Sequence, residues 1–117
     1  MDKYEISLWE DFPDLTENNI PFLNERKICT IGSDTMRGGA RAVEPKMINN
    51  VNGTNTFSFK MYYDYIDDFT GEKCRNPFIP LLINERKVKV FWKGVWYDLI
   101  IKDIEEESAG KGNIYTC

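Results

Sequence analysis

The residues of this chain that could do acid–base chemistry are carboxylates, because its 117 residues include no histidine. Nucleophilic catalysis by Ser or Cys usually needs a nearby base, most often histidine, and no Ser-x-x-Lys spacing offers lysine as a substitute. The runs Asp67-Asp68 and Glu105–Glu107 could supply the two carboxylates of a glycosidase, but such runs are far more often solvated loops. The sequence therefore predicts a protein that is not an enzyme.

Metal binding is also poorly supported by the residue pattern. Cys29, Cys74 and Cys117 are dispersed, with no Cys-x-x-Cys spacing, which indicates free thiols and argues against zinc. The segment Asp64–Glu72 holds four carboxylates of the kind that calcium prefers, but they lack the spacing of an EF-hand loop. We therefore expect no metal and no cofactor, and these carboxylates are expected to face solvent.

Aromatic residues are the stronger candidates for function. Trp92 and Trp96 flank the dipeptide Lys93-Gly94, and across a turn they could form a platform for sugar rings. The same pair could instead be cross-strand partners or a subunit contact, since aromatic pairs stabilise hairpins and Trp is enriched at interfaces. With Tyr62 and Tyr63, they are the candidate binding residues, for an interface or for a glycan.

The charge balance limits the classes of partner that the chain is expected to bind. The formal net charge is −4, whereas a protein that binds the phosphate backbone needs a basic face, so we expect no nucleic acid and no anionic membrane surface. No run approaches the roughly 20 apolar residues that cross a bilayer. The segment Met1–Glu5 lacks the apolar core of a signal peptide, so synthesis and folding are expected in a cytoplasm.

The elements that must position these residues are mostly strands. Alternation of apolar and polar residues, the period of a half-buried strand, predicts strands in four regions and the start of another after residue 112. The fourth region consists of two strands joined by the Lys93-Gly94 turn, which indicates a hairpin. The predicted strands are Tyr4–Glu10, Arg26–Ile31, Thr56–Tyr62, and the hairpin of Lys87–Trp92 with Val95–Ile104.

The segments between these strands are predicted with less regular structure. Asp11–Asn24 and Tyr63–Asn76 are expected to be loops, the second of them polar and acidic. Ala42–Val51 is expected to be extended, because Pro45 disfavours a helix through it. A short helix is expected to begin near Pro80, since proline is tolerated at a first helical position.

These elements together predict an all-β or β-dominated fold, a small barrel or sandwich of antiparallel strands with at most one short helix. The length fits one domain spanning residues 1–117. The final strand pattern, Asn113–Cys117, stops almost as it starts. We expect either that the chain is the N-terminal segment of a longer protein or that Cys117 closes the sheet.

The order of features from Val51 to Ile104 forms one further pattern. An Asn-Gly step precedes a strand of alternating Phe, an acidic excursion follows, and a later strand pair ends in an aromatic-rich strand. In order, these features are Asn52-Gly53, Thr56–Phe59, Asn76–Phe78 with Leu81-Leu82, Lys87–Val90 and Trp96–Ile104.

This pattern resembles the N-terminal hub domain of tail-associated lysin, or tail endopeptidase, proteins of phages and prophages from Gram-positive hosts. The resemblance implies a β-rich domain similar to a baseplate hub, which oligomerises, as a trimer, at the tail tip beneath the tail tube and distal tail protein. It implies a structural role in the virion, with no catalytic residues carried over. The alternative is a carbohydrate-binding β module that uses Trp92 and Trp96.

Overall fold

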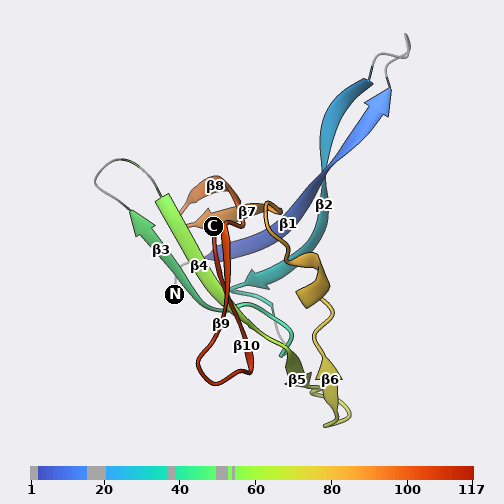
Figure 1. Cartoon of the computed structure of the whole chain (residues 1–117), viewed down its shortest axis with the longest axis vertical. Coiled ribbons are helices and arrows are strands. Elements are labelled where there is room, and N and C mark those ends of the chain that lie inside the picture. The colour runs from blue at the N-terminus through green and yellow to red at the C-terminus, as the bar shows by residue number, and fades with distance from the viewer. Residues whose placement is uncertain (1–2, 16–20, 37–38, 50–52, 54) are drawn as a thin grey trace.

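The computed structural model of the chain describes residues 3–15, 21–36, 39–49, 53 and 55–117, with side chains described throughout except at 12–15 and 21–24. The described residues form ten strands and one turn of 3₁₀ helix, arranged as two four-stranded antiparallel sheets and a separate two-stranded hairpin (Figure 1). In chain order the elements are β1 (Tyr4–Leu15), β2 (Pro21–Ser33), β3 (Val43–Asn49), β4 (Asn55–Tyr62), β5 (Asp64–Ile66), β6 (Lys73–Arg75), η1 (Ile79–Leu81), β7 (Lys87–Trp92), β8 (Val95–Ile100), β9 (Asp103–Glu106) and β10 (Gly112–Thr116).

Each main sheet is assembled from two hairpins that are distant in sequence. The first sheet has the order β2-β1-β7-β8 and the second has the order β3-β4-β10-β9. An early hairpin therefore meets a late one in both sheets, through antiparallel pairing of β1 with β7 and of β4 with β10. Among the described strands, β2, β8, β3 and β9 lie at sheet edges, so the sheets form a sandwich and not a closed barrel.

The core lies between the two sheets. Its side chains come from alternate residues along each strand, the ones that face inward, because successive side chains of a strand point to opposite faces. The second sheet contributes Phe57, Phe59 and Met61 from β4, each 0 or 1% exposed. The residues of the first sheet that face them include Ile6, Leu8, Val88 and Val90. The predicted all-β fold class, with strand Thr56–Tyr62 half-buried, is confirmed.

The predicted hairpin near the end of the chain is confirmed, but its second strand is shorter than expected. β7 and β8 pair in register from Lys87 to Trp92, and the strand then breaks at Ile101. Ile101 is buried, and its N–H donates to the Arg86 carbonyl at 3.1 Å. The residues that follow cross to the second sheet as β9. Alternation along Val95–Ile104 cannot reveal such a crossing, because it continues through Ile101 although the chain changes sheets there.

Two segments that were expected to be irregular are partly strand, and that expectation was wrong for them. Asp11–Asn24 holds the end of β1 and the start of β2, whose pairing includes Pro13 opposite Leu23. Proline is tolerated there because each of these strands has a free edge, where a missing N–H breaks no ladder. The acidic excursion Tyr63–Asn76 contains the β5–β6 hairpin.

The other two expectations about irregular segments hold. The extended structure expected for Ala42–Val51 is confirmed as β3 within the described part of that segment, which stops at Asn49. The helix expected near Pro80 is a single turn, Ile79–Leu81.

Candidate interaction surfaces

The long hairpin at the start of the chain leaves the sandwich. β1 pairs with β7 only along Tyr4–Trp9, whereas it pairs with β2 as far as Leu15. Among the described strands, the remaining part is a ribbon of two, Glu10–Leu15 with Pro21–Arg26, and we call it the arm. At about 3.4 Å per residue, the arm is about 20 Å long, and Figure 1 shows it projecting from the body.

The overall dimensions reflect this projection. The radius of gyration is 16.1 Å, and the molecule extends over 53 × 40 × 27 Å. A compact domain of this length would have a radius of gyration of about 13 Å. A ribbon of two strands is at best marginally stable alone in water, so the arm depends on its base or on a partner.

Ion pairs fix the base of the arm to β7. Lys87 Nζ lies 2.7 Å from Asp11 Oδ1 and 2.9 Å from Glu25 Oε1. Lys89 Nζ lies 2.8 Å from Glu25 Oε2 and 4.2 Å from the centroid of the Trp9 ring. Hydrogen bonds from Lys89 and Lys87 lower the pKa of Glu25 to about 2, and those to Asp11 and Glu25 raise the pKa of Lys87 to about 12. The arm is therefore held in a defined direction at its root.

The β7–β8 hairpin presents an aromatic pair on the outer face of the first sheet. Its two-residue turn, Lys93-Gly94, has φ of 49° and 85°, the left-handed values that a type I′ turn requires. This turn places Trp96 directly opposite Phe91, with ring centroids 5.2 Å apart. The Trp96 side chain is 55% exposed. The pair is thus a cross-strand contact that also offers an aromatic surface to solvent.

Trp92 lies on the opposite face of the same strand. Its ring packs between the sheets, 5.5 Å from the ring of Phe57 and 6.1 Å from the ring of Tyr4. Because neighbouring residues of a strand face opposite ways, Trp92 cannot share a surface with Trp96, which pairs with its neighbour Phe91. The joint platform of Trp92 and Trp96 expected from the sequence is therefore not formed.

Tyr62 and Tyr63 lie at the far end of β4, away from the β7–β8 turn. The Tyr62 ring lies 5.3 Å from Lys60 Nζ, and Tyr63 Oη donates to Asn113 Oδ1 at 2.6 Å. Partial burial and the nearby Glu106 raise the pKa of the Tyr63 hydroxyl. Both tyrosines are half-buried, so they stabilise the junction of β4 with β10 and do not join the exposed tryptophan in one site.

The β5–β6 hairpin carries the most exposed large hydrophobic side chain among the described residues. Phe69 is 98% exposed, and Ile66 beside it is 57% exposed. The sequence interpretation overlooked Phe69 because it treated this segment only as carboxylates. The available signal was an aromatic residue placed inside a polar turn, where burial in the same chain is improbable.

The carboxylates of this hairpin are used in structural contacts. Asp67 Oδ1 accepts hydrogen bonds from the N–H groups of Phe69 at 2.8 Å and Thr70 at 3.0 Å, which lower the pKa of Asp67. Asp64 lies 3.6 Å from both Lys73 and Arg75. Within the described part of the chain, no group of three or more Cys, Asp or Glu is arranged to hold a metal ion.

A hollow of about 460 Å³ lies beside the β8 and β9 edges, and it offers little chemistry. Its lining includes Val88, Leu99, Lys102, Asp103 and Cys117. Burial raises the pKa of the Cys117 thiol to about 12, so it stays protonated near neutral pH. A protonated thiol is a poor nucleophile, so Cys117 does not give this hollow an activated thiol.

Comparisons of the chain with protein-family models, with curated proteins and with solved structures found no significant match. None of the helical residues in the described ranges belongs to a helix long and apolar enough to cross a membrane. The features that bear on function are therefore the surfaces of the molecule itself. They comprise the arm, the Phe91–Trp96 pair and the tip of β5–β6.

Proposed function

We propose that this chain is a structural component of a virion, a hub or baseplate module that oligomerises at a phage tail tip. The observation that carries the proposal is the arm, a two-stranded ribbon that projects about 20 Å from the sandwich. A projecting ribbon with free edges can add to the sheet of another subunit, as extended segments do in β-strand addition. Proteins that act alone usually shield or shorten such edges.

The exposed aromatic side chains support the same proposal. Phe69 and Trp96 are more than half exposed in regions held by defined turns, and aromatic residues are enriched where proteins meet. The pattern from Asn52 to Ile104 that resembles tail hub domains adds the particular setting. In that setting the partners are copies of the same chain, as a trimer, together with the tail tube and distal tail proteins.

The proposal includes no catalytic step, no cofactor, no nucleic acid and no membrane. Its location is the virion tail tip, after synthesis in the host cytoplasm. Mass spectrometry and antibody labelling of purified tail-like particles test it directly. We expect the chain to be present in the particles and the label to lie at the tail tip. Particles that lack the chain, together with a protein that stays monomeric in solution, would refute the proposal.

A carbohydrate-binding role is the second candidate, and it now depends on Trp96 with Phe91. These rings form a small exposed surface, whereas Trp92 is packed between the sheets. Titration of cell-wall glycans while following tryptophan fluorescence separates the two roles. The hub proposal predicts no saturable response, whereas a sugar site predicts saturation that is lost in Trp96→Ala.

A further inference from the structure

The tip of the β5–β6 hairpin is a rigid aromatic projection. Phe69 is 98% exposed, yet the turn that carries it is held by hydrogen bonds: Asp67 accepts from the N–H groups of Phe69 and Thr70, and the Gly71 N–H donates to the Asp67 carbonyl at 2.9 Å. Gly71 has φ of 71°, which favours glycine at that position. A side chain presented by a pre-ordered turn loses little conformational entropy when it is buried by a partner.

This tip is also acidic. Asp68 and Glu72 flank Phe69, and neither makes an ion pair with any residue that the structure describes. The nearby basic side chains, Lys73 and Arg75, both pair with Asp64. The tip therefore presents an aromatic ring surrounded by unneutralised negative charge, and it fits an aromatic surface with a basic rim.

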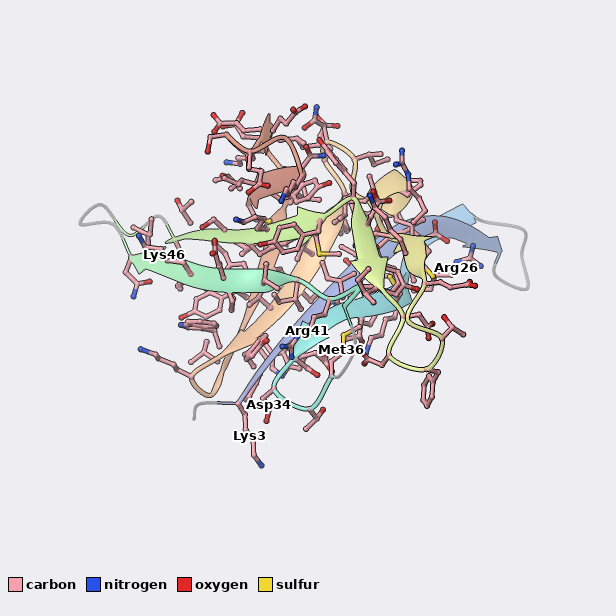
Figure 2. All side chains as sticks on the ribbon, turned by 90° about the horizontal axis from the view of Figure 1, so that it is seen from below. Lys3, Arg26, Asp34, Met36, Arg41 and Lys46 are labelled. Atoms are coloured by element: carbon pink, nitrogen blue, oxygen red, sulfur yellow. The ribbon has the colours of Figure 1, made fainter. Side chains whose placement is uncertain are left out.

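The same chain has such a surface at the β7–β8 turn. Two adjoining open hollows, of about 370 and 420 Å³, share Lys3 and Phe91 in their lining; one also includes Trp96 and the other Lys93. The carboxylates of Glu5 and Asp34 line the first hollow as well, and Glu5 lies 3.8 Å from Lys27 in an ion pair. Within the described part of the chain, neither Lys3 nor Lys93 has an ion-pair partner. Figure 2 shows the Lys3 side chain pointing away from the ribbon, beside Asp34. We call this surface the socket.

We propose that Phe69 of one copy docks in the socket of a second copy, with Asp68 and Glu72 facing Lys3 and Lys93. This inference rests on the oligomeric role proposed above and names its contact. The carboxylates of the tip and the lysines of the socket that lack ion-pair partners among the described residues are complementary in charge. The rings of Phe69, Phe91 and Trp96 can form the offset or edge-to-face contacts that aromatic groups prefer. Figure 1 places β5–β6 at the lower end of the molecule and β8 in its upper half, so one copy does not fill its own socket.

The contact is heterologous, because the tip and the socket are different surfaces of the same chain. Such contacts generate rings when the rotation closes and open filaments when it does not. A single side chain with its rim buries less surface than a stable interface needs, so we expect weak, concentration-dependent association in isolation. In an assembled ring, other contacts such as the arm would reinforce it.

The first test is the mass of the protein in solution as a function of concentration. We expect the weight-average mass of the unaltered chain to rise with concentration and Phe69→Ala to raise the dissociation constant at least about tenfold, as loss of an aromatic hot spot does. Ile83→Ala is the matched control, since Ile83 is also half exposed but lies outside both surfaces. Equal association of all three proteins would overturn the inference.

The second test mixes variants that each keep one surface. Phe69→Ala retains the socket, and Trp96→Ala retains the tip, so each alone should remain monomeric. Their mixture should form a 1:1 dimer that grows no further, a result that only a heterologous contact gives. A mixture that remains monomeric, when the unaltered chain associates, contradicts the proposed contact.

Charge reversal gives a test that does not alter the rings. Asp68→Lys with Glu72→Lys should weaken association, and adding Lys3→Glu with Lys93→Glu in the same chain should restore it. Failure to restore association would place the partner of the tip elsewhere. An unaltered chain that is monomeric at all concentrations but present in tail particles refutes this contact and leaves the proposed function standing.

Discussion

The sandwich and the projections that leave it use aromatic side chains in opposite ways. Phe59, in β4, is 1% exposed and stacks on Tyr115 with ring centroids 5.3 Å apart. Phe69, at the tip of β5–β6, is 98% exposed. The sandwich is stabilised by its own contacts, whereas the projections are ordered by local hydrogen bonds and ion pairs at their roots. Apolar surface in a projection is therefore available for a contact with another molecule.

The largest expected effect comes from breaking the core. Phe59→Ala should lower the free energy of unfolding by about 3–5 kcal/mol, because it removes a buried ring and leaves a cavity. Phe69→Ala makes the same chemical change in a projection and should alter stability by no more than about 0.5 kcal/mol. Urea denaturation of both variants measures the difference. Similar losses for the two would mean that the tip is packed against the chain in solution.

The buried thiol of Cys117 predicts a loss of stability at alkaline pH. Its pKa is about 12 in the folded protein, whereas an unfolded thiol ionises near 8.5–9. Above that unfolded value, the unfolded state has lost the proton that the folded state retains, so stability falls with rising pH until about 12. The slope from this group is at most about 1.4 kcal/mol per pH unit.

Cys117→Ala provides the control for that prediction. Other groups also titrate in this range, so the quantity to compare is the slope of the unfolding free energy against pH between 9 and 12. The slope should be shallower in the variant by the contribution of the thiol. Parallel curves would show that the thiol is not buried as the folded structure has it.

Shortening the arm should change stability little. Replacing residues 12–24 by Asn-Gly joins Asp11 to Glu25 through a two-residue hairpin turn and keeps the pairing of β1 with β7. In the replaced segment β1 and β2 pair only with each other among the described strands, so we expect a change in unfolding free energy of less than about 1 kcal/mol. Thermal unfolding measures this. Failure of the shortened chain to fold would show that the arm stabilises the sandwich.

The smallest expected effect concerns the root of the arm. The pKa of Glu25 is lowered to about 2, so its contacts with Lys87 and Lys89 persist above the ordinary carboxyl pKa and are lost as pH falls through about 2. Glu25→Gln should speed hydrogen exchange of β1–β2 amides near the root at neutral pH, with core amides of β4 unchanged. High salt should reduce the difference, because these groups are exposed. Equal exchange rates of the root amides in the unaltered protein and in Glu25→Gln would show that the ion pairs do not hold the arm.

Much of the fold was predictable because the alternation of apolar and polar residues along a strand follows directly from the burial of one face of that strand. Phe57, Phe59 and Met61 alternate with polar residues, and one face of β4 is buried as that pattern demands. Lys93-Gly94 indicated a two-residue turn because glycine favours a positive φ, and in the structure Lys93 adopts one as well. The arm was missed because Asp11–Asn24, which contains Pro13 and Pro21, was expected to be a loop, although a ribbon with free edges tolerates proline.

The candidate site was predicted less well, because its geometry depends on register. Trp92 directly precedes the turn, whereas Trp96 is the second residue after it, so the pairing sets Trp92 opposite Val95 and Phe91 opposite Trp96. One tryptophan is thereby directed to the core and the other to solvent. Phe69 had no periodic pattern around it; its place inside a polar turn was the one signal in the sequence, and its position on a projecting hairpin shows that it is exposed.

The class of fold, the main strands and the β7–β8 turn can be predicted from the residues alone, because they follow from the period of two and from backbone preferences of single residues. Three features became visible only in the folded structure. An early and a late hairpin share each sheet, β1 and β2 extend beyond the end of their pairing with β7, and Phe69 is exposed to solvent. Those outcomes depend on which strands find one another across long stretches of chain, and on where a neighbouring strand ends. No local pattern encodes that information.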